Sequence, residues 1–122
     1  MAKKDPRILE HTLTEEQRAA LARLSAGVRA RLGDRLDELL LFGSRARGDA
    51  EEESDIDVLV LTRDEPRPED RRSVSGLAVD LQIETRVFLP FSLVLMSRAR
   101  FEELRERVRR FALDIEAEGI AL

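Results

Sequence analysis

The chain has no cysteine, tryptophan or tyrosine and only one histidine among its 122 residues. The absence of cysteine excludes a disulfide framework and any thiolate metal site. The single histidine, His11, lies in a charged lead-in without a neighbouring partner, and we interpret it as inert. No apolar run approaches the length of a membrane span, and no apolar signal segment follows the N-terminus, so the sequence predicts a cytoplasmic protein without a membrane partner.

Positive charge is not in excess, because 21 Lys and Arg stand against 25 Asp and Glu, a formal net charge of −4. This balance argues against a general nucleic-acid binder, which normally has a basic footprint. Hydrophobic residues make up 43% of the chain and charged residues 38%, which is typical of a small globular protein with a charged surface. The length predicts a single domain over residues 1–122, with residues 1–13 as a lead-in that can be flexible.

Apolar periodicity predicts helices alternating with buried strands. Thr14 and Gln17 have the form of a capping box ahead of a helical apolar stripe, and Gly33 is placed to end that helix. The predicted helices cover residues 14–32, residues 69–85 and, as one long or two consecutive helices, the stretch from 97 to a stop at Gly119; the predicted strands cover residues 35–42, 55–62 and 91–96. This order predicts an α/β fold in which a small sheet packs against helices.

The stretch between the first two predicted strands has the features of a phosphate-binding turn. Gly43 follows the first strand, and without a Cβ it allows a sharp turn and a close approach of a phosphate to the main chain. Ser44 can cap one helical turn that runs to Arg47 and ends at Gly48. The N-terminus of such a turn offers N–H groups and partial positive charge to an anion.

Two aspartates open the second predicted strand. Asp55 and Asp57 stand two apart, so they project from the same face while Ile56 points to the other. Carboxylate oxygens suit Mg²⁺, which proteins usually hold through one or two carboxylates with substrate phosphates and water. A phosphate-binding turn beside a metal pair predicts phosphoryl or nucleotidyl transfer. The alternative interpretation is an acidic, solvated loop between two core strands.

Gly43-Ser44, ten further residues and then Asp55-Ile56-Asp57 resemble the G-S-x10-D-x-D signature of the DNA polymerase beta-like nucleotidyltransferase superfamily. Residues 43–48 and 54–60 are most similar to its small prokaryotic branch, the minimal nucleotidyltransferases. The core of the resemblance spans residues 39–61, with a fainter likeness to the end of the chain. It implies a mixed sheet of the nucleotidyltransferase type, which periodicity alone does not decide.

The resemblance also implies a reaction. A nucleoside triphosphate, most often ATP in this branch, would bind with Mg²⁺ or Mn²⁺, an acceptor hydroxyl would attack the α-phosphate, and pyrophosphate would leave. The implied site residues are Asp55 and Asp57 for catalysis and the metal, and Gly43, Ser44, Arg45 and Arg47 for the phosphates. Each arginine has two other interpretations, as a surface residue or as a partner of the acidic loop.

Active members of the superfamily usually carry a third carboxylate on the following strand, which completes the metal site and helps to deprotonate the acceptor. Here that run, residues 91–96, contains no acid, and Ser92 holds the corresponding position. Asp80 or Glu84 on the preceding helix would need a favourable rotation to replace it. The sequence therefore leaves two hypotheses, a nucleotidyltransferase and a weak or inactive module with the same fold that acts by contact.

Both hypotheses lead to the same kind of partner. By resemblance, minimal nucleotidyltransferases often occur beside a helical HEPN-domain protein and act as antitoxin to its ribonuclease. The acceptor hydroxyl can then lie on that toxin or on a small molecule, and a homo-oligomer is also left open.

Overall fold

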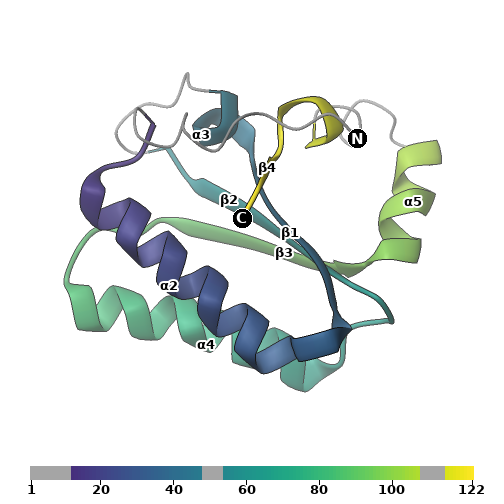
Figure 1. Ribbon diagram of the computed structural model, residues 1–122, viewed down its shortest axis with the longest axis horizontal. Helices are drawn as coiled ribbons and strands as arrows, with labels where there is room; N and C mark the ends of the chain where they lie inside the picture. Colours follow the sequence, from purple (N-terminus) through teal and green to yellow (C-terminus); the bar gives the residue numbers. More distant parts are fainter. Residues whose placement is uncertain (1–11, 48–53, 108–114) are drawn as a thin grey trace.

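The computed structural model describes residues 12–47, 54–107 and 115–122, and all structural statements here concern those residues. The helices are α2 (Glu15–Leu32), α3 (Gly43–Arg47), α4 (Pro68–Thr85) and α5 (Arg98–Arg107), with a 3-10 turn η2 (Gly33–Arg35), and the strands are β1 (Leu36–Phe42), β2 (Ile56–Thr62), β3 (Phe91–Ser97) and β4 (Ile120–Ala121). The strands form one sheet in the order β3-β2-β1-β4, and α2 and α4 lie together across one of its faces (Figure 1).

The sheet is mixed, as predicted. β1 runs antiparallel to β2 on one side and to β4 on the other, whereas β2 and β3 are parallel. A parallel pair needs a long crossover connection, and α4 supplies it between β2 and β3. β4 was not predicted, because a strand of two residues has no periodic signal of its own.

The first helix begins and ends where the sequence predicts. The Thr14 hydroxyl accepts a hydrogen bond from the Gln17 N–H at 3.0 Å, and the Gln17 side chain accepts one from the Thr14 N–H at 3.1 Å. These reciprocal bonds are the predicted capping box. Gly33 follows the last residue of α2 with a φ of 55°, a conformation that favours glycine.

The other predicted elements are also present, within one or two residues at most ends. Gly76 does not interrupt α4. The expected C-terminal helical region is helical over Arg98–Arg107 and again over residues 115–118, and what joins them lies outside the described residues. The predicted stop at Gly48 and the acidic stretch after it lie outside them too.

Alternate residues of β2 contribute to two different cores. Val58 and Val60 pack in the larger core, which lies between the sheet and helices α2 and α4. Leu59 packs in a smaller core on the opposite face, together with Phe101 of α5. Since side chains alternate along a strand, Asp57 shares the α5 face with Leu59 and points away from α2 and α4.

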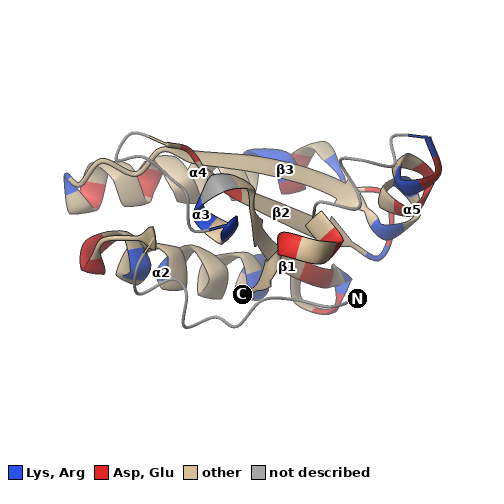
Figure 2. Cartoon of the chain, turned by 90° about the horizontal axis from the view of Figure 1, so that it is seen from above, with Lys and Arg blue, Asp and Glu red and all other residues tan. Residues whose placement is uncertain are grey.

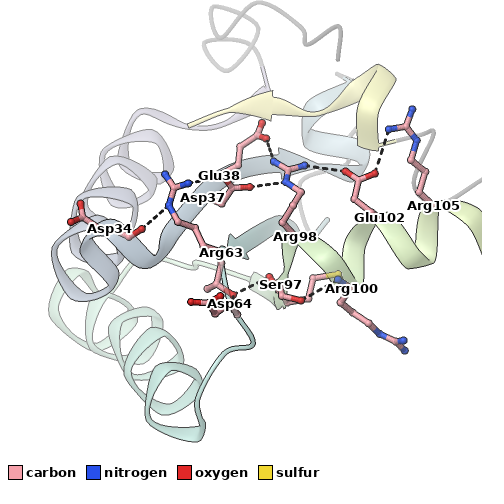
Figure 3. A network of polar contacts seen from close by, with 12 residues as sticks. Asp34, Asp37, Glu38, Arg63, Asp64, Ser97, Arg98, Arg100, Glu102 and Arg105 are labelled. Atoms are coloured by element: carbon pink, nitrogen blue, oxygen red, sulfur yellow. Dashed lines mark hydrogen bonds and ion pairs between the residues drawn. The ribbon is translucent and has the colours of Figure 1, made fainter.

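An ion-pair network joins α5 to β1 at one end of the sheet (Figure 3). Arg98 donates hydrogen bonds to Asp37 and Glu38, both at 2.6 Å, and Arg63 lies 3.8 Å from Asp37. Both acids lie near the start of β1, whereas Gly43 follows its last residue. The network therefore stabilises the end of the sheet far from the glycine turn.

Acidic and basic residues are interspersed along the long helices (Figure 2). In the described ranges, no helix is both long and apolar enough to cross a bilayer.

Candidate functional site

The sheet register brings three of the predicted positions together. Across the sheet Asp57 pairs with Phe42 of β1 on one side and with Ser92 of β3 on the other. Phe42 packs on the smaller core, and Ser92 has the same strand parity as Val94, which packs there as well. Asp57 and Ser92 therefore share the α5 face of the sheet, beside the turn that begins at Gly43.

Gly43 and Asp57 are in direct contact. Gly43 has a φ of 74°, in the left-handed region that side chains rarely adopt. A Cβ built on it would overlap the Asp57 carboxylate, with Oδ2 closest and Cγ at 3.2 Å. From the sequence, we interpreted this glycine as a residue that lets a phosphate approach the main chain. The structure shows an additional reason, which is that the carboxylate of Asp57 occupies the space.

The two aspartates have different environments. Asp55 is exposed, whereas Asp57 is only partly exposed. Burial raises the pKa of the Asp57 carboxyl and the nearby charge of Asp55 raises it further, while a hydrogen bond with Ser92 and the charge of Arg47 act in the opposite direction. The net rise in the pKa of Asp57 means that hydrogen bonds and nearby positive charge do not fully offset the cost of ionising this carboxyl. Binding of a cation would therefore be favourable there.

Ser92 lies beside Asp57, at the position predicted for a third carboxylate, and its side chain hydrogen-bonds to that aspartate. Asp80 and Glu84 do not lie there, because α4 covers the other face of the sheet. Glu84 instead pairs with Arg23 of α2 at 2.5 Å, and Asp80 is exposed. Neither acid supplies a third carboxylate. Within the described ranges no three His, Cys, Asp or Glu side chains gather as a metal-binding group.

Arg45 differs from the expectation that it contacts the triphosphate. Its residue is only 5% exposed, and its guanidinium donates to the main-chain oxygens of Thr12 at 2.6 Å and Ser54 at 3.0 Å. A buried guanidinium bonded to the main chain is a structural group rather than a ligand for an incoming anion. Through Ser54, Arg45 fixes the residue that immediately precedes Asp55.

Arg47 is placed differently from Arg45. Its side chain is 40% exposed, and its Nη1 lies 3.4 Å from Oε2 of Glu118. Its charge also acts on Asp57, so it lies within electrostatic reach of that aspartate. Ser44 is the second residue of α3, which already begins at Gly43, so it lies inside the helical turn and does not cap it as predicted. No sequence pattern pointed to Glu118 as a partner of Arg47, since the two residues are 71 positions apart.

The family model for the nucleotidyltransferase domain matches residues 21–116, which is most of the chain. The chain belongs to the nucleotidyltransferase domain family. This confirms the family that the Gly-Ser and Asp-x-Asp residues indicated.

Similarity to individual nucleotidyltransferases is more limited. A stretch of 47 residues is 47% identical to "Putative protein adenylyltransferase MJ0141" of Methanocaldococcus jannaschii. The matched stretch covers 38% of this chain and 48% of the Methanocaldococcus protein, which is about half the length of that relative.

Solved structures show the same fold. A crystal structure described as a "putative nucleotidyltransferase" from Sulfolobus solfataricus has a TM-score of 0.56 at 21% identity, covering 97% of this chain and 87% of that one. A toxin-antitoxin structure with AMP-PNP has a TM-score of 0.52 at 22% identity, covering 88% of this chain and 72% of that one. At these identities the likeness concerns the fold of the nucleotidyltransferase domain.

Proposed function

We propose that this nucleotidyltransferase domain transfers AMP from ATP to a hydroxyl acceptor with the help of a divalent metal ion. The observation that carries the proposal is the contact between Gly43 and Asp57, which joins the glycine turn and the aspartate pair in one site. The adenylyl group is favoured because a relative that matches 38% of the chain is named as a protein adenylyltransferase. A function that depends on ATP would place the protein in the cytoplasm.

The side chains present fit Mg²⁺ or Mn²⁺. Asp55, which immediately precedes β2, and Asp57 within β2 offer hard oxygen ligands close enough for their charges to interact, and the raised pKa of Asp57 supports a cation there because it would offset the cost of ionising this carboxyl. When bound, such an ion neutralises the negative charge that develops on the phosphate oxygens. We assign no part in this site to Arg45, whose guanidinium is bonded to the main chain.

The chain's own residues would then orient the nucleotide. The main chain at Gly43 and Ser44 faces the phosphates, and the exposed Arg47 supplies a guanidinium that suits phosphate oxygens. Ser92 stands where an active relative carries an acid, so the acceptor hydroxyl would lose its proton to solvent. General-base help is typically worth about 10²- to 10⁴-fold, so we expect slow transfer.

A second candidate function is that of a module acting by contact with a partner, and exposed apolar residues favour it. Val79 and Ile83 on the outer side of α4 are 57% and 68% exposed, and Phe88 after the helix is 58% exposed. We propose a HEPN-domain toxin as the partner, since a solved structure with this fold is a toxin-antitoxin with AMP-PNP. The two functions are compatible if the acceptor hydroxyl lies on that toxin.

The test is a labelling experiment with two forms of ATP. The protein is incubated with Mg²⁺ or Mn²⁺, with and without the product of the neighbouring reading frame, and with ATP labelled at either the α- or the γ-phosphate. Nucleotidyl transfer moves only the α-label to the acceptor, whereas phosphoryl transfer would move only the γ-label. The double variant Asp55→Asn with Asp57→Asn is the control and should lose the α-label.

The outcomes separate the two functions. Transfer of the α-label by the wild type but not by the double variant supports the nucleotidyltransferase function. Equal labelling by the double variant would show that the catalytic site lies elsewhere. A wild type that binds the neighbouring protein without labelling it would favour the contact module over the transferase.

A further inference from the structure

An acid from the C-terminal segment lies against the proposed phosphate-binding arginine. Oε2 of Glu118 is 3.4 Å from Nη1 of Arg47, and the two side chains are 28% and 40% exposed. Neither α3 nor the aspartate strand contributes this acid. The pair therefore connects the C-terminal segment to the site at Asp57, on which the charge of Arg47 also acts.

The position of Glu118 is fixed by the backbone on both sides of it. After it, β4 pairs with β1, with Ile120 opposite Leu41, two residues before Gly43. Before it, the Gly119 N–H donates to the Ile115 carbonyl at 2.8 Å and closes the preceding turn. Ile115 itself is buried in the smaller core. The backbone that carries Glu118 is thus fixed beside the end of β1, near the glycine turn, and its side chain reaches Arg47 from there.

The same segment contains a much tighter ion pair for comparison. Glu116 lies 2.7 Å from Arg105 of α5 and its side chain is 13% exposed. The Arg47–Glu118 pair is longer and more exposed, and such pairs contribute little stability. A guanidinium forms stronger, bidentate hydrogen bonds with phosphate oxygens, so exchanging Glu118 for a triphosphate costs Arg47 little.

We infer that Glu118 pairs with Arg47 in the nucleotide-free protein, and that the triphosphate replaces Glu118 as the partner of Arg47 when the nucleotide binds. Glu118 then acts against nucleotide binding in two ways, since it competes for the guanidinium and places a negative charge beside the phosphates. It is a positioning residue that weakens affinity, and its removal strengthens affinity. This inference rests on the proposed function, because it requires that the phosphates bind at Arg47.

The test is calorimetric titration with Mg²⁺ and a non-hydrolysable ATP analogue, repeated with inorganic triphosphate. We expect Glu118→Gln to bind both about two- to fivefold more tightly than the wild type, the range for a half-exposed ion pair. The gain should shrink at high salt because exposed charges are screened. Glu116→Gln is the matched control, since it removes the same charge two residues away and should leave the affinity unchanged.

A double variant decides whether the effect passes through Arg47. In an Arg47→Gln background, Glu118→Gln should gain clearly less affinity than it does in the wild-type background. Unchanged or weaker binding by Glu118→Gln, or an equal gain from Glu116→Gln, would overturn the inference while the proposed function stands. A wild type that binds neither the analogue nor inorganic triphosphate would overturn both.

Discussion

The carboxylate of Asp57 occupies the space that Gly43 leaves by having no Cβ. This contact gives a physical reason for the two halves of the sequence pattern to occur together. The aspartate needs the glycine, because any side chain at residue 43 would displace the acid, and under the proposed function a bound phosphate needs it too. A change at one position is therefore expected to act on the function of the other.

Gly43→Ala should lose nucleotide binding by displacing Asp57. The added Cβ would overlap Oδ2, and the φ of 74° adds strain of about 1–2 kcal/mol for a residue with a side chain. Changes that shift a metal-binding carboxylate typically cost about 10- to 100-fold in metal affinity. Titration with Mg²⁺ and a non-hydrolysable ATP analogue measures the loss, and an unchanged affinity would show that the site does not involve Asp57.

Gly76→Ala is the matched control for that substitution. A Cβ at Gly76 meets nothing within 4 Å, and the residue lies inside α4. Alanine is favoured over glycine in a helix by about 1 kcal/mol, so the free energy of unfolding should rise slightly. Nucleotide affinity should stay at the wild-type value.

Arg45 and Arg47 should respond differently to the same substitution. Arg45→Met removes the buried hydrogen bonds to Thr12 and Ser54, and the free energy of unfolding should fall by about 3 kcal/mol. Arg47→Met removes an exposed ion pair and should cost at most about 1 kcal/mol of stability while weakening triphosphate binding. Urea unfolding measures the first effect and calorimetry the second. Equal losses of stability would contradict this division of roles.

Much of this arrangement follows from local patterns in the sequence. The capping box at Thr14 and the parity of Asp57 and Ser92 depend on neighbouring residues only, and the structure agrees with both. Ser92 was placed near the aspartates through the family resemblance, and in the structure the parallel strands β2 and β3 pair it with Asp57.

The features that the sequence did not predict depend on contacts between distant residues. Arg45 and Arg47 look alike in the sequence, and only the contact with Thr12, 33 residues away, makes one of them a buried structural group. Asp80 and Glu84 were candidates until the topology placed α4 across the opposite face from Asp57. Periodicity describes one face of an element but does not say which side of the sheet it covers.

Asp70 should make the stability of the protein depend on pH at the acidic end. Its carboxylate accepts hydrogen bonds from Arg35 at 2.7 Å and from the Arg67 N–H at 2.9 Å. The bond from Arg35 is the main reason that the pKa of Asp70 is lowered. A lowered pKa means that this stabilisation is complete above the unfolded value of about 3.9 and is lost as the pH falls through the folded value.

Asp70→Asn should therefore be less stable than the wild type near pH 7, by about 1 kcal/mol for a lost helix-capping bond. The difference should shrink as the pH falls through the lowered pKa of Asp70, because the wild-type carboxyl then becomes protonated as well. Thermal unfolding between pH 2 and 7 measures it, with the exposed Asp80→Asn on the same helix as control. A difference that persists at the lowest pH would show that the charge of Asp70 is not what stabilises the start of α4.

Ser92→Asp should restore a third carboxylate to the site. Ser92 pairs with Asp57 across β2 and β3 and hydrogen-bonds to it, so an aspartate there would face the same metal position. Without a cation the added charge would raise the pKa of Asp57 further and lower the thermal stability of the metal-free protein. With Mg²⁺ that repulsion becomes coordination, so metal affinity and the rate of α-label transfer should both rise. A gain of at least about tenfold in rate is expected, since general-base help is typically worth 10²- to 10⁴-fold. Ser92→Asn, of similar size but uncharged, should show neither gain. If the wild type already transfers the label rapidly and Ser92→Asp abolishes that transfer, the base comes from the acceptor, the nucleotide or water, and the serine is part of a working site.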